Sequence, residues 1–267
     1  MTSAPPLPAF FISHGAPTLP IDEGAPAKAH LERLGSTLAK EVGRPRAILV
    51  LSAHWETAQP TVSAAAAPET LYDFHGFPEP LYRLAYPAPG APDLAADVAE
   101  RLRAAGFDAR IDPDRGLDHG AWTPLLLMVP DAAIPVLQLS IQPAAGPGRH
   151  IAIGRALAPL RREGVLILGS GAATHNLRAF RGQPPDAPAA DWALAFADWL
   201  EEAVAADDEA ALAAYRSAPE GARNHPTPEH FLPFFAAYGA RSPGVAGKPV
   251  HRSMRHGILA MDCYRFD

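Results

Sequence analysis

The sequence has almost no cysteine and no long hydrophobic run. Its 267 residues include one cysteine, Cys263, which excludes an intrachain disulfide and a cysteine-rich zinc module. No apolar stretch approaches the roughly 20 residues that span a bilayer. The first residues also lack the basic region of a signal peptide. We therefore expect a cytoplasmic protein without a membrane partner.

Basic charge is scarce as well. Lys and Arg total 23 against 29 Asp and Glu, the formal net charge is −6, and no basic run is longer than Arg161-Arg162. Surfaces that bind nucleic acids or anionic membranes need basic patches, so neither partner is expected. At 48% hydrophobic residues the chain can bury one sizeable core, which predicts a single domain over residues 1–267.

Short apolar runs alternate with helical patterns along the chain. Runs at residues 9–13, 47–52, 134–141 and 165–169 have the length of strands buried on both faces of a largely parallel sheet. Helical patterns cover residues 27–41, 93–105, 150–162 and 186–206, with Asp93 and Asp186 as candidate caps or first-turn acids. The alternation predicts an α/β fold, an α/β/α sandwich around a largely parallel central sheet.

One long irregular stretch, residues 69–92, contains the string YDFHGFPEPLYRLAYPAPG. A loop of this length in a compact domain is usually functional or disordered. Its aromatic residues argue against disorder. We expect it to line or cover a binding site.

Histidine is the chemically informative residue type. Five of the 11 histidines lie beside predicted strands or in distinctive strings. His14, His54 and His175 each follow an apolar run, and the carboxyl ends of strands in an open α/β sheet meet at one crevice. His119 precedes an apolar helix-like run, and His230 lies in HPTPEHFLP, so both can reach the crevice from its flanks.

The string around His230 carries helix-start signals. Thr227 is a candidate cap, Pro228 suits the first helical position and Glu229 suits the first turn. His30 and His150, by contrast, fall within helical patterns and are expected to be solvated.

Three histidines at one sheet edge favour a metal site. Imidazole is the commonest side-chain ligand for zinc and iron, and three ligands with open positions make a reactive site rather than a structural one. A single histidine after a strand is more often a hydrogen-bonded loop residue. The sequence strings around the histidines decide between a metal site and a set of hydrogen-bonded loop residues.

Seven strings in the chain resemble those of one enzyme family. They are SHGAP, LSAHW, YDFxGFP, LDHGAW, GSGxxTHNL, HPTPEHFLP and LAMDCYRFD. In this order, from about residue 10 to the C-terminus, they are similar to the DODA-type extradiol dioxygenases of the LigB superfamily. Each string alone is a weak signal, but seven in order are highly specific.

The resemblance implies a fold, a reaction and a set of site residues. The family's fold is an α/β/α sandwich, and the resemblance implies ring cleavage with O₂ of a catechol such as 3,4-dihydroxyphenylalanine (DOPA) or a caffeate-like acid, with 4,5-cleavage for DOPA. By resemblance, His14, His54 and His230 bind Fe(II), with Zn(II) an expected occupant of purified protein. His175 matches the acid–base histidine, which in some members is a fourth ligand, and His119 matches a histidine facing the substrate.

One position departs from the LigB pattern. LigB enzymes use two histidines and a glutamate, whereas His230 stands here at the place of the carboxylate, with Glu229 beside it. Neighbours on a helix point about 100° apart, so we expect only one of the two to bind metal.

Two other functions stay open at this point. A zinc hydrolase would use the same nitrogen ligands to activate water. A Memo-like binding protein would keep the fold and the histidines without catalysis. The string GSGxxTHNL and the aromatic loop favour the dioxygenase, and Arg83 or Arg178 would be the cation for a substrate carboxylate.

Overall fold

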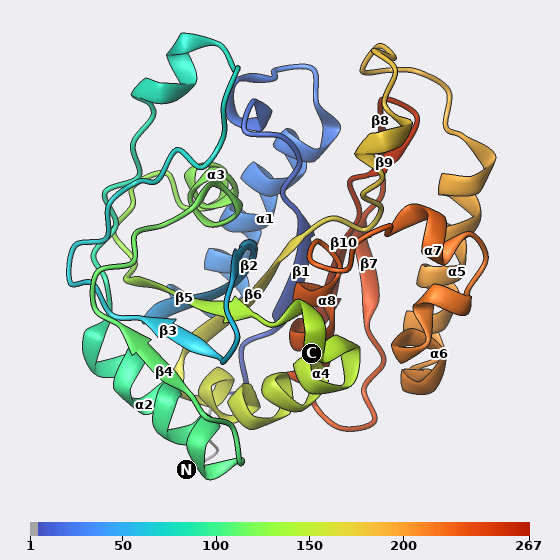
Figure 1. The fold of residues 1–267 in the computed structure, drawn as a ribbon. Coiled ribbons are helices and arrows are strands. Elements are labelled where there is room, and N and C mark those ends of the chain that lie inside the picture. Colours follow the sequence, from blue (N-terminus) through green and yellow to red (C-terminus); the bar gives the residue numbers. More distant parts are fainter. Residues whose placement is uncertain (1–4) are drawn as a thin grey trace.

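An eight-stranded mixed sheet with the order β4-β3-β5-β2-β6-β1-β10-β7 forms the centre of the fold. A computed structural model describes residues 5–267 (Figure 1). The inner strands β5 (Val136–Ile141), β2 (Ala47–Glu56), β6 (Val165–Gly171) and β1 (Ala9–Ser13) pair in parallel. The predicted largely parallel sheet is therefore confirmed.

Shorter strands complete the sheet on both sides. β3 (Thr61–Ser63) pairs antiparallel with β5 and parallel with β4 (Arg110–Asp112). β10 (Cys263–Phe266) pairs antiparallel with both β1 and β7 (Lys248–His251). A separate two-stranded sheet consists of β8 (Met254–Arg255) and β9 (Leu259–Ala260).

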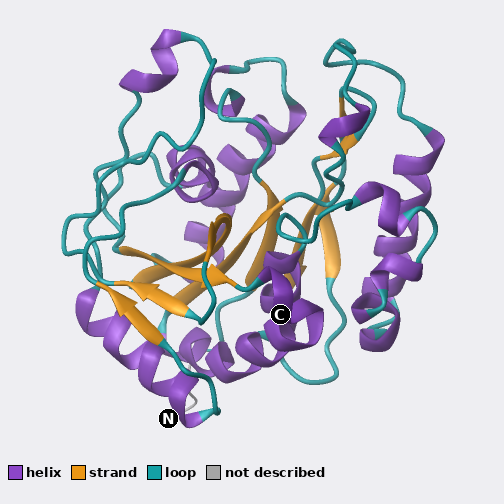
Figure 2. Ribbon diagram, in the orientation of Figure 1, coloured by secondary structure: helices purple, strands orange, loops and turns teal. Residues whose placement is uncertain are grey.

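Helices cover both faces of the sheet (Figures 1 and 2). One face carries α1 (Pro26–Val42) and α3 (His119–Met128). The other carries α2 (Pro92–Ala104), α4 (Gly146–Leu157) and α8 (Leu232–Gly239). Beside β7 lie α5 (Asp191–Ala205), α6 (Glu209–Ala213) and α7 (Gly221–Asn224). Short 3-10 helices span Leu19–Ile21, Glu79–Arg83, Pro143–Ala145, Ala158–Glu163, Leu177–Ala179 and Tyr215–Ser217.

The inner strands are largely apolar because each face of the sheet is buried. Along β1, Phe11 packs into the core under α4 and α8, while Phe10 and Ile12 pack into the core under α1 and α3. Successive side chains on a strand point to opposite faces, so covering both faces requires apolar residues at every position. The sequence pattern therefore identified the four inner strands, and it missed the shorter strands of residues 5–267.

Three helix predictions were wrong in their details. α5 begins at Asp191, so Asp186 neither caps it nor lies in its first turn. α8 begins at Leu232, after a turn in which Phe231 N–H donates to Pro228 O, and His230 lies in that turn. The Thr227 hydroxyl donates to Glu229 instead of capping a helix. By contrast, Asp93 does lie in the first turn of α2, as predicted.

His150 is buried, which contradicts its predicted exposure. Its Nδ1 lies 2.7 Å from Gly146 O, and its Nε2 accepts from the N–H of Gln142 at 3.1 Å. His30 is buried as well, with its ring stacked 4.6 Å from that of His251. A helical pattern shows which face of a helix is apolar but does not show that a histidine on that face finds a partner.

Among residues 5–267, no helix is both long and apolar enough to cross a membrane. The cytoplasmic location stays a prediction from the sequence.

Candidate active site

All five histidines singled out in the sequence line one cavity of about 250 Å³. His14 follows β1, His54 lies near the end of β2, and His175 follows β6. His119 is the first residue of α3, and His230 comes from the turn before α8. The carboxyl ends of the parallel strands thus bring together residues that lie far apart in the sequence.

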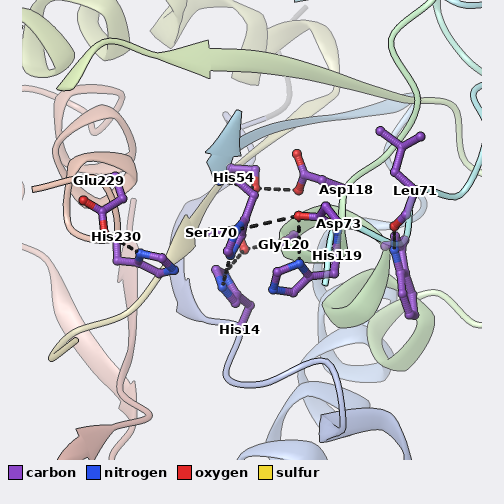
Figure 3. Close-up of polar contacts among 12 residues, drawn as sticks. His14, His54, Leu71, Asp73, Asp118, His119, Gly120, Ser170, Glu229 and His230 are labelled. Atoms are coloured by element: carbon purple, nitrogen blue, oxygen red, sulfur yellow. Dashed lines mark hydrogen bonds and ion pairs between the residues drawn. The ribbon is translucent and has the colours of Figure 1, made fainter. Parts of the chain in front are cut away.

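The rings form two groups within this cavity. His14, His54 and His119 have ligand atoms within 4.8 Å of one another, and so do His175, Glu229 and His230. The groups face each other, with ring centroids 5.6 Å apart for His14 and His230 and 4.9 Å apart for His54 and His230 (Figure 3). The rings of the two groups therefore face each other across 4.9 to 5.6 Å between centroids.

Hydrogen bonds determine which nitrogen of His14 faces the cavity. Ser170 Oγ donates its only proton to Gly120 O, so it accepts from His14 Nδ1 at 3.0 Å. The lone pair of His14 is therefore on Nε2. This atom lies 3.0 Å from Nε2 of His54.

Asp73 organises the second and third histidines. Its carboxylate accepts from the backbone N–H of His119 and from His119 Nδ1, both at 2.9 Å, and lies 3.7 Å from His54 Nδ1. A carboxylate behind a histidine ligand fixes the ring's tautomer and turns its other nitrogen toward the metal. Asp73 comes from the YDFHGFP string in the irregular stretch, which confirms that this stretch borders the site.

Sequence reasoning missed Asp73 as a site residue. The signal was a carboxylate inside the aromatic string, but nothing in the sequence shows that residue 73 meets His119. Asp118 was missed in the same way. It is fully buried and accepts hydrogen bonds from Ser52 Oγ at 2.6 Å and Gln138 Nε2 at 2.7 Å.

The second group has fewer polar contacts. Glu229 Oε1 lies 3.1 Å from His230 Nδ1 and accepts from Thr227 Oγ1 at 3.0 Å. The ring of His175 stacks on that of His230 at 3.4 Å with an interplanar angle of 13°. Within residues 5–267 the His175 ring makes no hydrogen bond, although its backbone N–H donates to Asn224 O at 3.0 Å.

Two glycines permit the close packing behind the histidines. A Cβ on Gly120 would lie 2.3 Å from Ser52 Oγ and 3.1 Å from Cδ2 of His54. A Cβ on Gly171 would lie 2.0 Å from His230 O, an atom that accepts from the N–H of Ala172 at 2.8 Å. Any side chain at either position would displace a histidine. The GSG string therefore serves close backbone approach.

Burial keeps His14, His54, His175 and His230 neutral. It lowers the pKa of His14 and His230 well below the usual value, and neighbouring histidines lower each further. Burial also lowers the pKa of His54 and of His175 to about 4. Although burial alone raises the pKa of Asp73, its hydrogen bonds to His119 lower that pKa below the usual value. A neutral imidazole has the lone pair that a metal requires.

The residues fit a metal ion. The Nε2 of His14 carries its lone pair and lies 3.0 Å from the Nε2 of His54, so the two ring nitrogens converge on one point in the cavity. Two ring nitrogens at this distance repel unless a proton or a cation lies between or beside them. Neutral nitrogen ligands suit iron and zinc rather than magnesium or calcium.

Three further polar residues lie outside the cavity. Arg83 is exposed and pairs with Glu79, and Arg178 is exposed as well. His225 is buried, with Nε2 2.9 Å from Ala173 O, and braces the segment that precedes His175.

Comparison with known proteins identifies the class. Residues 8–259 match the family model of the catalytic LigB subunit of aromatic ring-opening dioxygenases. The chain therefore belongs to the LigB family and is an extradiol aromatic ring-opening dioxygenase of the DODA type, an oxidoreductase. This confirms the resemblance found in the sequence.

The relatives include plant and bacterial enzymes. The chain is 45% identical to a 4,5-DOPA dioxygenase extradiol of Beta vulgaris over 96% of this chain and 95% of that protein. It is 38% identical to one of Escherichia coli K12, over 88% of this chain and 85% of that protein. A crystal structure of an uncharacterised Escherichia coli K12 protein superposes with a TM-score of 0.80 at 33% identity, covering 98% and 100% of the two chains.

Proposed function

We propose that this protein opens the ring of a substituted catechol beside its diol, using O₂ and an Fe(II) ion bound by His14, His54 and His230. DOPA and caffeate are the first substrates to assay, since relatives are named for DOPA. The observation that carries the proposal is the convergence of the His14 and His54 Nε2 atoms at 3.0 Å in a cavity lined by five histidines. We propose that residues 1–267 form one catalytic domain.

The third ligand is His230 rather than Glu229. The His230 ring lines the cavity, whereas Glu229 does not and accepts from the Nδ1 of His230. His119 is the competing third ligand, because its ring centroid is 3.9 Å from that of His54. Metal content of His119→Ala and His230→Ala decides between them: His230→Ala should lose the metal and His119→Ala should retain it.

The metal and the histidines have separate tasks. Fe(II), held by His14, His54 and His230, would supply the redox chemistry between a catecholate and O₂, which zinc cannot supply. His175, neutral and without a ring hydrogen bond in residues 5–267, accepts a phenolic proton and later returns it as the ring opens. His119, held by Asp73, orients the substrate oxygens.

Oxygen uptake tests the proposal. Fe(II)-loaded protein should consume O₂ when given a catechol, and a yellow ring-opened semialdehyde should form in proportion. Zinc-loaded protein should bind the catechol and leave O₂ untouched. A zinc hydrolase would instead be active with zinc and would not consume O₂ when loaded with Fe(II). Iron-loaded protein that takes up no O₂ across a panel of catechols would refute the dioxygenase function.

A further inference from the structure

A second cavity, of about 360 Å³, lies beside the histidine cavity. We call it the outer chamber. The two cavities share wall residues, which are Gly15, Ala16, Phe77, Leu177, Leu259 and Met261. The two cavities are therefore adjacent and have a wall in common.

The walls of the outer chamber are almost entirely apolar. Leu19, Phe180 and Met254 line it in addition to the shared residues. Leu177 and Phe180 are among the exposed large hydrophobic side chains of the described chain, at 56% and 43% exposure. Apolar side chains gathered around an open cavity of this size are typical of a ligand site.

The charges in the chamber wall compensate each other. Asp22 and Arg255 both line the chamber, and the Arg255 guanidinium donates to the Asp22 carboxylate. Their side chains are only 27% and 20% exposed. A carboxylate entering the chamber would compete with Asp22 for Arg255 and, apart from Thr18, Ser253 and His256, would face apolar walls, which costs free energy.

We propose that the outer chamber binds the ring substituent of the catechol and selects one that is elongated, apolar and uncharged. This inference rests on the proposed function, because the diol must face the histidines for the opposite edge of the ring to point toward the shared wall. The Asp22–Arg255 pair is then a specificity determinant, since it withholds a cation from an amino-acid or carboxylate side chain.

A series of 4-alkylcatechols tests the selection. Each methylene buried in the chamber should raise kcat/KM about three- to fourfold, from catechol through 4-methylcatechol and 4-propylcatechol to 4-hexylcatechol. DOPA should fall below 4-propylcatechol. Calorimetric titration of zinc-loaded protein should show the same order in Kd, which separates binding from oxygen chemistry.

Variants of the chamber provide the controls. Thr18 lines only the outer chamber, so Thr18→Trp should narrow it and lower the ratio of kcat/KM for 4-hexylcatechol to that for catechol about tenfold or more. Thr18→Val, of nearly the same size, should keep the wild-type ratio. Asp22→Asn should leave Arg255 available and raise kcat/KM for 3-(3,4-dihydroxyphenyl)propanoate about tenfold. The double variant Asp22→Asn/Arg255→Met should lose that gain.

The outcomes separate the proposed dioxygenase function from the inference about the outer chamber. If no catechol supports O₂ uptake, the proposed function itself fails. If catechol is oxidised but chain length has no effect, or DOPA is preferred to 4-propylcatechol, the function stands and the chamber inference is wrong. The inference is also wrong if Thr18→Trp lowers kcat/KM equally for catechol and 4-hexylcatechol.

Discussion

The two walls of the histidine cavity are built differently. His14 and His119 are hydrogen-bonded to side chains rooted in the sheet or the aromatic loop, Ser170 and Asp73. On the opposite wall, His230 contacts only its neighbour Glu229 in this way, and His175 is held mainly by stacking on His230. A ring held by hydrogen bonds, such as that of His14 or His230, suits metal binding, which requires preset nitrogen positions, whereas the His175 ring, without such bonds in residues 5–267, retains both nitrogens for proton transfer.

The largest expected effect comes from the wall of the cavity that carries His14 and His54. His14→Ala or His54→Ala removes one of the two converging nitrogens, so each variant should lose most of its metal and bring O₂ uptake below detection. Metal analysis after dialysis against iron, with circular dichroism to confirm the fold, measures this. Full metal occupancy in both variants would contradict the assignment.

The opposite wall should separate metal binding from turnover. His175→Ala should retain iron and lower kcat by about 10²–10⁴, because it removes general acid–base help without removing a proposed ligand. Metal content and single-turnover rates on the same sample provide the check. Loss of metal in step with rate would make His175 a fourth ligand, and wild-type kcat would remove it from the mechanism.

A substitution of Asp73, which lies behind His119, should have an intermediate effect on activity. Asp73→Asn keeps the size of the side chain but weakens its acceptor toward His119 Nδ1, so activity or metal affinity should fall about 10- to 100-fold. Glu79→Gln is the matched control, because Glu79 lies nearby in the chain and pairs only with the exposed Arg83. Equal effects of the two substitutions would mean that the loop as a whole, and not the carboxylate, matters.

His150 extends the comparison to a histidine outside the site. Burial lowers its pKa to about 4, and the hydrogen bond to Gly146 opposes this only in part. Between pH 6.5 and 4 the unfolded chain therefore binds a proton that the folded chain does not, so stability falls as pH decreases. His150 should account for about 2 kcal/mol of the loss between pH 7.5 and pH 5.

Urea unfolding of metal-free protein at both pH values measures this contribution. His150→Gln should start from lower stability and lose about 2 kcal/mol less than wild type on acidification. If His150→Gln had the same pH dependence as wild type, His150 would have the same charge in the folded and the unfolded chain.

The sequence predicted the sheet and the clustering of the five histidines because both follow from local patterns. Uninterrupted apolar runs mark strands buried on both faces, and residues at their carboxyl ends meet at one edge. It did not predict the partners behind the rings. Asp73 meets His119 across 46 positions and Ser170 meets His14 across 156, and no local pattern records such pairings. The start of α8 was misplaced because Thr227 and Pro228 are typical of a helix start but here form the preceding turn.

The loop that carries Asp73 also supplies Phe74 and Phe77 to the cavity wall. One segment therefore lines the proposed substrate cavity and also fixes the ring of His119. A substrate that pushes this loop outward loosens its own fit and misaligns His119 in the same movement. Poor substrates of this enzyme should accordingly be slow as well as weakly bound, and sequence changes in a single short loop are enough to alter both properties together.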